Sequence, residues 1–271
     1  MTEVKNCPYC NEDNKRIVGV QNHKDKYLSL VDERLNDIER VWFKCDSCRF
    51  VFRSPAITEE EATIIYSKYR TYEFRKITPE DYFNKIISLP LEESDSYKKA
   101  LFVKSNIQSK VSSILDIGCG AGFLLYHLKK LFPETKMMGL EPNTDYSSMV
   151  RKKLNIEVVE DYYKVGSIND SFDLTVSTNV LEHIHDLRIF WEAAYTNIKQ
   201  NKYLFIEVPS QNDFKLLDMD HDVFATPHLY FFGMEHIVDI AKEFNFKLIS
   251  YKFNLENDRG MGKEWFIFVK E

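Results

Sequence analysis

The sequence predicts an α/β fold, in which a mostly parallel, doubly wound sheet follows a small cysteine-containing module. Two observations support this prediction. Beyond residue 110, short apolar runs alternate with longer amphipathic stretches, which is the pattern of strand–helix units in a parallel sheet covered on both faces. Ahead of them, four of the five cysteines lie within the first 48 residues. The 271 residues suffice for one large domain with a small appendage.

The N-terminal cysteines form two pairs with the same spacing. Two residues separate Cys7 from Cys10, and two separate Cys45 from Cys48. Each such turn lets two thiolates converge on one cation, and two turns complete a tetrahedral Zn²⁺ site. Apolar runs that read as strands lead into and out of the second pair. We therefore predict a zinc-ribbon-like module over residues 1–55, with the zinc in a structural or substrate-shaping role.

Charge and composition limit the kind of partner. The chain has 36 Lys+Arg and 42 Asp+Glu, a net charge of −6, whereas a strong nucleic-acid binder usually has a basic excess. No run approaches the roughly 18 apolar residues of a membrane-spanning helix, and the first residues lack the apolar core of a signal peptide. We therefore expect a soluble, cytoplasmic protein with a small-molecule partner, without nucleic acid and without membrane insertion.

The residues between the module and the sheet, 56–110, read as a helical lead-in. Thr58 is a predicted N-cap with Glu61 three residues on, which is the capping-box pattern, and this helix is expected to run to about Tyr69. Helical spacing resumes from about residue 94 to 109. The tyrosines of the segment fit two interpretations, a helix-packing face or a lid over a ligand, and the sequence does not separate them.

Seven apolar runs are expected to form the sheet of a domain over residues 111–271. They are residues 113–117, 137–140, 156–159, 172–177, 203–208, 246–251 and 265–269. Segments of helical period lie between most of them, at residues 123–131, 147–154, 187–198 and 234–244. The last two runs follow each other without an intervening helix, so we predict that they pair as a C-terminal antiparallel hairpin.

The sharpest motif begins in the first of these strands. Asp116 lies near the strand's end, and a turn with Gly118, Gly120 and Gly122 follows and leads straight into a helix. Glycines let the backbone approach a ligand closely at a helix N-terminus, where nucleotide-like cofactors bind. Glu141 ends the next strand about 20 residues later, which suits hydrogen bonds to ribose hydroxyls. An NAD-type dehydrogenase is disfavoured, because it would carry G-x-G-x-x-G and not G-C-G-A-G.

With these motifs the sequence resembles the class I S-adenosylmethionine-dependent methyltransferases. Three family motifs match in order, D-I-G-C-G-x-G, L-E-P-N and V-L-E-H, and the resemblance covers roughly residues 90–271. It implies a Rossmann-like, seven-stranded methyltransferase domain with S-adenosyl-L-methionine as cofactor. The cofactor-binding residues that it implies are Asp116, Gly118, Cys119, Gly120, Gly122, Glu141 and Asn179. The adenine would contact Glu160 or Asp161, of which we favour Asp161.

The cysteine module narrows the resemblance to bacterial sugar methyltransferases, including C-methyltransferases of nucleotide-linked deoxysugars. That group carries a histidine followed by an aromatic run, as His228 is here. The resemblance places His228 over the cofactor's methyl group as the leading general-base candidate, ahead of His183, and His221 and His236 are further candidates. The chain departs from the C-methyltransferases at Ala225, where they often have tyrosine, and in ending at residue 271 without their extra C-terminal domain.

These departures favour O- or N-methylation of a sugar, nucleotide-linked or other capsule or lipopolysaccharide precursor. One alternative is C-methylation of a nucleotide deoxysugar, and another is a non-catalytic protein that docks a partner through its zinc module. The intact Asp116 and Glu141 speak against a non-catalytic protein. A divalent metal at Glu182–His183 is disfavoured, because the quinone-pathway O-methyltransferases that use such a pair add a glutamate where this chain has Asn179.

Overall fold

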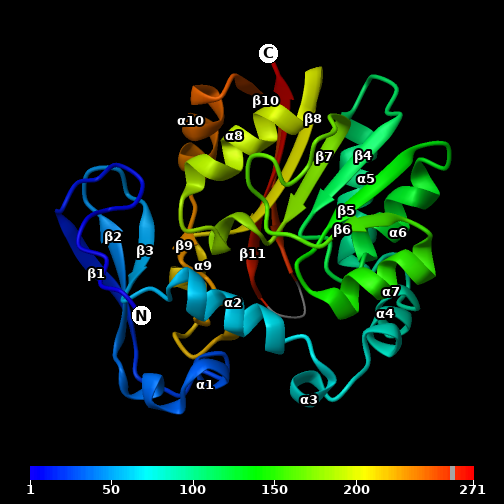
Figure 1. Ribbon diagram of the computed structural model, residues 1–271. Helices are drawn as coiled ribbons and strands as arrows, with labels where there is room; N and C mark the ends of the chain where they lie inside the picture. Colours follow the sequence, from blue (N-terminus) through cyan, green and yellow to red (C-terminus); the bar gives the residue numbers. More distant parts are fainter. Residues whose placement is uncertain (257–259) are drawn as a thin grey trace.

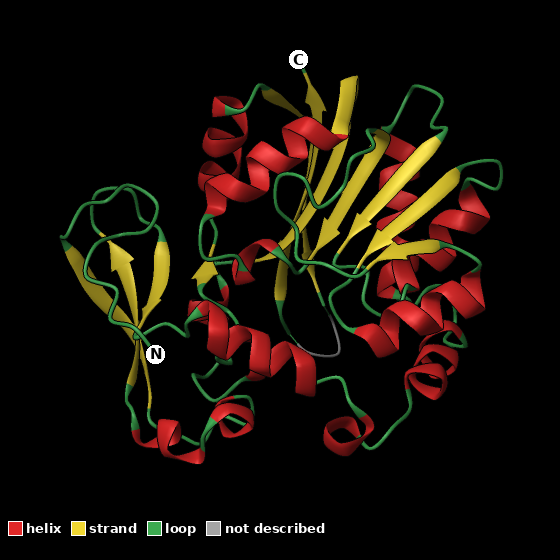
Figure 2. Ribbon diagram, viewed as in Figure 1, coloured by secondary structure: helices red, strands yellow, loops and turns green. Residues whose placement is uncertain are grey.

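The larger part of the protein is a seven-stranded sheet in a computed structural model that describes residues 1–256 and 260–271 (Figures 1 and 2). The strand order is β10-β11-β8-β7-β4-β5-β6. The strands are β4 (Ser113–Ile117), β5 (Lys136–Leu140), β6 (Glu157–Val159), β7 (Phe172–Thr178), β8 (Ile198–Pro209), β10 (Phe246–Leu255) and β11 (Gly262–Lys270). All seven apolar runs are therefore strands, as the sequence predicts, and β8 and β10 extend beyond their predicted ends.

Strand direction also follows the prediction. The five strands from β8 to β6 pair in parallel, with β4 at the centre between β7 and β5. β11 runs antiparallel to both of its neighbours, β10 and β8. The carboxyl ends of the parallel strands consequently meet at one edge of the sheet, which is where open α/β sheets bind ligands.

Helices cover both faces of the sheet, and alternate residues of each strand supply the two resulting cores (Figure 2). On one face lie α5 (Asp95–Asn106), α6 (Phe123–Leu131) and α7 (Thr144–Leu154), and on the other lie α8 (Leu187–Asn197) and α10 (Met234–Glu243). In β4, Ile114 faces the first core, whereas Leu115 and Ile117 face the second.

The part of the lead-in that precedes α5 runs across the carboxyl edge of the sheet as three helices (Figure 1). They are α2 (Glu59–Lys68), α3 (Tyr72–Arg75) and α4 (Pro79–Ile87). The predicted capping box is present: Glu61 N donates to Thr58 Oγ1 at 3.2 Å, and Thr58 N donates to Glu61 Oε2 at 2.8 Å. The sequence prediction missed α4, although Thr78 caps it and Pro79 opens it.

The N-terminal module is a small antiparallel sheet, and one of its four strands comes from the C-terminal part of the chain. Its strands are β1 (Lys15–Gln21), β2 (Arg40–Cys45), β3 (Val51–Ser54) and β9 (Tyr230–Phe231), in that order. The predicted strands around the second cysteine pair correspond to β2 and β3. Helix α1 (Leu28–Val31) and the 3₁₀ turn η1 (Glu33–Asp37) lie between β1 and β2. β9 begins two residues after His228. The chain segment that carries His228 therefore also completes the sheet of the N-terminal module.

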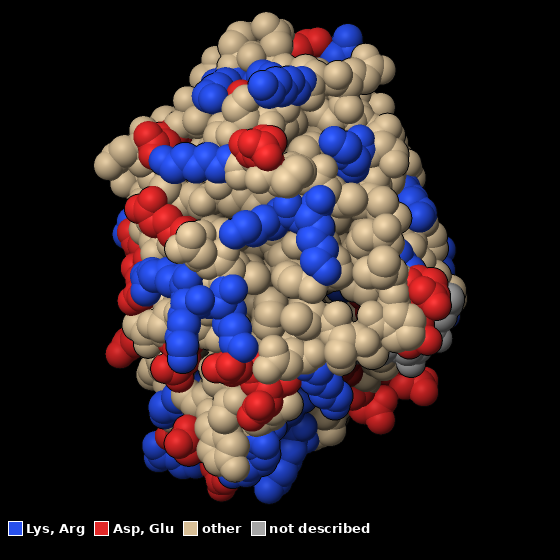
Figure 3. Space-filling view, turned by 90° about the vertical axis from the view of Figure 1, so that its right-hand side faces the viewer, with Lys and Arg blue, Asp and Glu red and all other residues tan. Residues whose placement is uncertain are grey.

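No helix in residues 1–256 and 260–271 is long and apolar enough to cross a membrane. The face on the right of Figure 1 carries Lys and Arg side chains interspersed with Asp and Glu (Figure 3). Mixed charge of this kind is ordinary for a protein surface, and that face gives no separate indication of a partner.

Candidate functional site

The glycine turn between β4 and α6 forms the floor of the site. Gly118, Gly120 and Gly122 have φ of +65°, +53° and +77°, a region that residues with a Cβ rarely adopt. A Cβ at Gly118 would lie 2.5 Å from the Val180 side chain, so this turn also packs tightly against the next loop. The turn is held by its own N–H groups: Cys119 N donates to Leu140 O at 3.0 Å, and Gly122 N donates to Cys119 O at 2.9 Å.

Two carboxylates flank this turn, and they differ in their hydrogen bonds. Glu141, at the end of β5, accepts from Gly120 N at 2.8 Å and from Asn143 N at 3.0 Å. Asp116 is 1% exposed, and its Oδ1 has no hydrogen-bond partner among the described residues. Burial, and then the nearby Glu141, raise the pKa of Asp116 well above its ordinary value. Glu141 is thus held in place, whereas Asp116 has an unused acceptor.

Arg70 is a site residue that the sequence prediction missed. Its Nη1 lies 3.3 Å from Glu141 Oε2, and the guanidinium stacks on the rings of Tyr69 and Tyr146. A Cβ on Gly120 would lie 2.7 Å from Nη1, so Arg70 reaches directly over the glycine turn. It follows α2 in the lead-in. Its position in the site depends on how α2 packs across the edge of the sheet, which the sequence alone does not reveal.

A cavity of about 620 Å³ opens above the turn. Gly118, Cys119, Gly120, Glu141, Asn179 and His183 line it, together with Tyr66, Tyr69, Arg70 and Arg75 from the lead-in. Six of the predicted site residues therefore share one cavity, and the lead-in forms its outer wall. Asp116 and Gly122 lie beneath the lining. Such a cavity has the size range of a small-molecule or cofactor site.

The candidate adenine contacts do not line this cavity. Glu160 pairs with Arg151 at 2.6 Å and accepts from Ser147 at 2.8 Å. Asp161 lies 3.6 Å from Lys164 and accepts from the next backbone N–H. The lining from this segment consists of Tyr162, Tyr163 and Lys164. Contact of Asp161 with an adenine thus stays a prediction.

Two of the candidate histidines meet where His183 lines the cavity, with His228 behind it. The rings of His183 and His228 lie 4.8 Å apart between centroids. His183 Nδ1 is 2.8 Å from Pro227 O, and His228 Nδ1 is 2.6 Å from Val223 O. A carbonyl can only accept, so each ring carries its proton on Nδ1 and has a lone pair on Nε2. Burial lowers the pKa of both, that of His183 to about 4.

Glu182 lies between these two rings. Its Oε1 is 4.0 Å from both Nε2 atoms, and neither of its carboxylate oxygens has a hydrogen-bond partner among the described residues. Burial raises the pKa of Glu182 to about 8. Burial thus favours the protonated form of this carboxyl over the carboxylate. One oxygen and two nitrogens within 4.8 Å can also hold a divalent cation.

Asn179 has φ of +52° at the end of β7 and faces the cavity from a fixed position. Its Nδ2 donates to Glu207 Oε1 at 2.8 Å, and Lys263 Nζ donates to its Oδ1 at 2.7 Å. Glu207 is fully buried and pairs with Lys99 at 2.6 Å. The amide is consequently held by Glu207 of β8 and Lys263 of β11.

A family model for the methyltransferase domain matches residues 85–251. The chain belongs to the class I S-adenosylmethionine-dependent methyltransferases. Solved structures agree on the fold. The methyltransferase superposes with a TM-score of 0.57 on the 1,6-didemethyltoxoflavin-N1-methyltransferase of Burkholderia thailandensis, with 11% identity over 83% of this chain and 97% of that chain. The magnesium protoporphyrin IX methyltransferase of Synechocystis PCC 6803 gives 0.55, with 12% identity over 80% and 100%.

Curated relatives match a shorter stretch of the methyltransferase. The pavine N-methyltransferase of Thalictrum flavum subsp. glaucum is 26% identical over 126 residues, 44% of this chain and 35% of that protein. The mitochondrial ubiquinone biosynthesis O-methyltransferase of Rattus norvegicus is 29% identical over 103 residues, 34% of this chain and 29% of that protein. The chain thus spans about a third of the length of these relatives.

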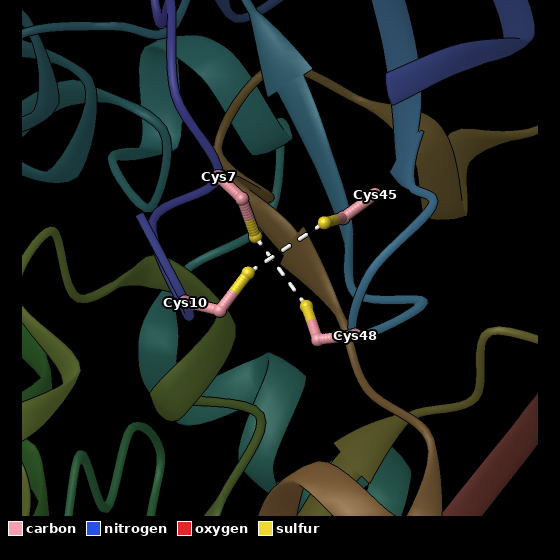
Figure 4. A group of neighbouring side chains, drawn as sticks. All are labelled: Cys7, Cys10, Cys45 and Cys48. Atoms are coloured by element: carbon pink, nitrogen blue, oxygen red, sulfur yellow. Dashed lines mark hydrogen bonds between the residues drawn. The ribbon is translucent and has the colours of Figure 1, made fainter. Parts of the chain in front are cut away.

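The four N-terminal cysteines of the methyltransferase converge from two turns (Figure 4). Sγ of Cys7 lies 3.6 Å from that of Cys48, and Sγ of Cys10 lies 3.6 Å from that of Cys45. In a tetrahedral site with Zn–S bonds of about 2.3 Å, the sulfurs lie about 3.8 Å apart. These two distances are close to that value, and all four sulfurs lie within 4.8 Å of one another, so the four cysteines could hold a Zn²⁺.

The other two candidate histidines of the methyltransferase have structural partners. His236 Nδ1 accepts from Gly233 N at 2.9 Å, and its Nε2 lies 2.9 Å from Cys48 O, so it joins α10 to the cysteine turn. His221 Nδ1 accepts from Val223 N at 3.1 Å. Neither ring lines the cavity above the glycine turn.

Proposed function

We propose that this chain transfers a methyl group from S-adenosylmethionine to an oxygen or nitrogen of a small acceptor. The observation that carries the proposal is the cavity that joins the glycine turn and Glu141 at one end to His183 at the other. The cofactor would supply a methyl group bonded to a sulfonium, an electrophile that needs no further activation.

The residues around the cavity fit this cofactor. Oδ1 of Asp116, which has no hydrogen-bond partner in the part of the chain that the structure describes, would accept from an ammonium donor, and the Glu141 carboxylate suits ribose hydroxyls. The guanidinium of Arg70, which reaches over the glycine turn, suits a carboxylate. A cationic sulfonium finds tyrosine rings from the lead-in on the opposite wall.

On the acceptor side, the chain has to align a nucleophile and keep water out. Transfer forms a C–O or C–N bond, breaks a C–S bond and leaves one acceptor proton to be taken up. His228 is the proposed base, because its Nε2 lone pair is fixed by the bond from Nδ1 to Val223 O. His183 is the second candidate, because its Nδ1 bonds Pro227 O and its Nε2 likewise carries a lone pair.

The acceptor class rests on the resemblance to sugar methyltransferases. We propose a sugar, nucleotide-linked or other capsule or lipopolysaccharide precursor, methylated on oxygen or nitrogen. The curated relatives include an N- and an O-methyltransferase, which supports these two elements over carbon. C-methylation of a nucleotide deoxysugar is the second candidate, supported by His228 and the aromatic run after it.

The cysteine cluster is proposed to hold one structural Zn²⁺, since four thiolates at tetrahedral spacing are a closed site without an open position. The division into residues 1–55, 56–110 and 111–271 is kept as the proposed domain organisation, with the lead-in as a lid over the cofactor.

Two measurements test the function. Isothermal titration with S-adenosylhomocysteine tests the cofactor, and no binding at high micromolar ligand would exclude the enzyme. Mass spectrometry of nucleotide sugars and surface-polysaccharide precursors incubated with S-adenosylmethionine tests the acceptor, with a gain of one CH₂ as the positive result. Cofactor binding without any methylated product across the panel would favour the non-catalytic, partner-docking alternative.

A further inference from the structure

Glu182, His183 and His228 form a group of converging hydrogen-bond acceptors, which we call the Glu–His–His group. The Glu182 side chain is fully buried, and neither of its oxygens has a hydrogen-bond partner in residues 1–256 and 260–271. Its Oε1 lies 4.0 Å from Nε2 of each histidine. The oxygen and the two nitrogens lie within 4.8 Å of one another, so one small group between them would contact all three.

The two rings are held with their Nε2 lone pairs free to accept. His183 Nδ1 bonds Pro227 O at 2.8 Å, and His228 Nδ1 bonds Val223 O at 2.6 Å. Because a carbonyl only accepts, each ring has its hydrogen on Nδ1 and its lone pair on Nε2. A carboxyl keeps an acceptor oxygen in either protonation state. The group therefore presents three acceptors to whatever lies between them.

The group lies beside the cofactor cavity. His183 lines the cavity above the glycine turn, and both histidines line a smaller cavity of about 130 Å³ next to it. Their side chains keep 20% and 17% of their surface exposed. Tyr66 borders both cavities, and among the described residues its hydroxyl also has no hydrogen-bond partner. The smaller cavity needs to admit only the reacting group of an acceptor whose remainder extends into the larger one.

The number of hydrogens on the bound group distinguishes the possible ligands. An anion has no hydrogen to donate and would face acceptors on every side. A hydroxyl has one hydrogen and satisfies one acceptor of the three. A primary ammonium has three N–H donors, and hydrogen bonds of about 2.9 Å at tetrahedral angles place its acceptors about 4.7 Å apart. The spacings of the Glu–His–His group, 4.0 Å and at most 4.8 Å, are close to this arrangement.

A divalent cation matches the same group less well. Metal–ligand bonds of about 2.1 Å in a tetrahedral site bring the ligand atoms to about 3.4 Å from one another. The oxygen–nitrogen distances of 4.0 Å would have to shorten for such a site to form. The cysteine cluster differs in this respect, because its sulfur spacings of 3.6 Å are already close to those of a zinc site.

We propose that the Glu–His–His group binds the reacting nitrogen of the acceptor, and that this acceptor is a primary amine bound as its ammonium. The proposal rests on the proposed function for the reaction and narrows it from oxygen or nitrogen to nitrogen. His228 Nε2 takes one proton, and the freed nitrogen lone pair attacks the methyl carbon. A C–N bond forms, and the C–S bond breaks with its electron pair left on sulfur. The product leaves as a secondary ammonium, and His228 returns its proton to solvent.

Binding is tested on the full chain with methylammonium, a probe that carries the reacting group without the rest of an acceptor. Methanol and tetramethylammonium are the matched probes, since they have one and no donor hydrogen. Two-bond ¹H–¹⁵N spectra report the ring nitrogens of each histidine. We expect millimolar methylammonium to shift Nε2 of His183 and His228, with His221 and His236 unmoved. The other two probes should leave all four rings unmoved.

Glu182→Gln tests the carboxyl, because it removes the charge that pairs with an ammonium and keeps the shape. We expect it to weaken methylammonium binding about tenfold, with S-adenosylhomocysteine affinity unchanged. Asp213→Asn is the matched control. Asp213 is also fully buried with an oxygen that no described residue donates to, and it lines neither cavity. Equal weakening in the two variants would refute the role of Glu182.

Ring nitrogens that methylammonium does not shift would overturn the proposal, since solvent would then fill the group. Loss of the His183 and His228 signals at equimolar Mn²⁺ would overturn it in favour of a cation site. In any acceptor that gains CH₂, fragmentation should locate the methyl group on nitrogen, and an O-methyl product would overturn the amine assignment. Absence of S-adenosylhomocysteine binding is a separate result, because it contradicts the proposed function and leaves the methylammonium titration to judge the group.

Discussion

Asp116 and Glu141 flank the same glycine turn, yet only one of them has its hydrogen bonds satisfied. Glu141 accepts from two backbone N–H groups, whereas Asp116 Oδ1 is buried and none of residues 1–256 and 260–271 donates to it. An unpartnered buried carboxylate costs folding free energy. We expect a donor of the bound cofactor to complete the site, so the two carboxylates are tested separately.

Asp116→Asn should weaken S-adenosylhomocysteine binding by about tenfold or more, because the charge that pairs with an ammonium is lost. The free energy of unfolding should stay the same or rise. The folded-state pKa of Asp116 is raised, so its carboxyl destabilises the protein as the pH rises through that pKa, and the amide removes this effect. Titration calorimetry and urea unfolding measure the two effects. Unchanged affinity would place Asp116 outside the cofactor site.

His228→Ala should leave S-adenosylhomocysteine affinity unchanged and lower turnover of the identified acceptor about 10²- to 10⁴-fold, as expected for loss of a general base. His221→Ala is the matched control, because its ring bonds Val223 N and lines neither cavity. Turnover that survives His228→Ala but fails in His183→Ala would move the base role to His183.

At the scale of elements, the strands and helix ends that depend on local interactions could be predicted from the sequence. The strands β4, β7, β8 and β11 are mostly buried apolar runs, and the start of α2 is specified by Thr58 and Glu61 alone. The site residues on the glycine turn and at Glu141 were predictable, because strand ends converge in a parallel sheet. Arg70 was not, since its role depends on how α2 packs across that edge.

Thr58→Ala tests whether the cap of α2 matters to the cavity wall. Loss of the N-cap and its capping box should lower the free energy of unfolding by about 1 kcal/mol. Because α2 supplies Tyr66 to the cavity and leads into Tyr69 and Arg70, S-adenosylhomocysteine should also bind more weakly. Urea unfolding and calorimetry provide the values, and Ser67→Ala, which loses only a bond to Ile64 O, is the control. Equal behaviour of the two variants would contradict a lid role for α2.

At the scale of the whole molecule, the cysteine module and the larger sheet are packed into one core. Cys7, Cys45 and Phe50 belong to the same buried cluster as Leu115 and Leu140 of the sheet. The sequence indicated a separate ribbon, because nothing local to residues 1–55 shows that its outer strand pairs with residues 230–231. Such long-range pairing is fixed by packing and not by local pattern.

Zinc removal should therefore affect the whole chain. Metal analysis of the purified protein should give about one Zn per chain at the four-thiolate site, and Cys45→Ser should lower it. The melting temperature of the entire protein should fall in a single calorimetric transition, because the module shares its core with the sheet. Zinc content insensitive to Cys45→Ser would refute the site, and a separate early transition would refute the shared core.

The pairing of β3 with β9 also bears on how such chains can be recombined. The strand that completes the N-terminal sheet is encoded about 175 residues downstream of β3, next to His228. A chimera that exchanges only the first 55 residues between relatives would match a foreign β3 to the resident β9. Successful exchanges should need two crossover blocks, the N-terminal residues and the segment 222–232, inherited together.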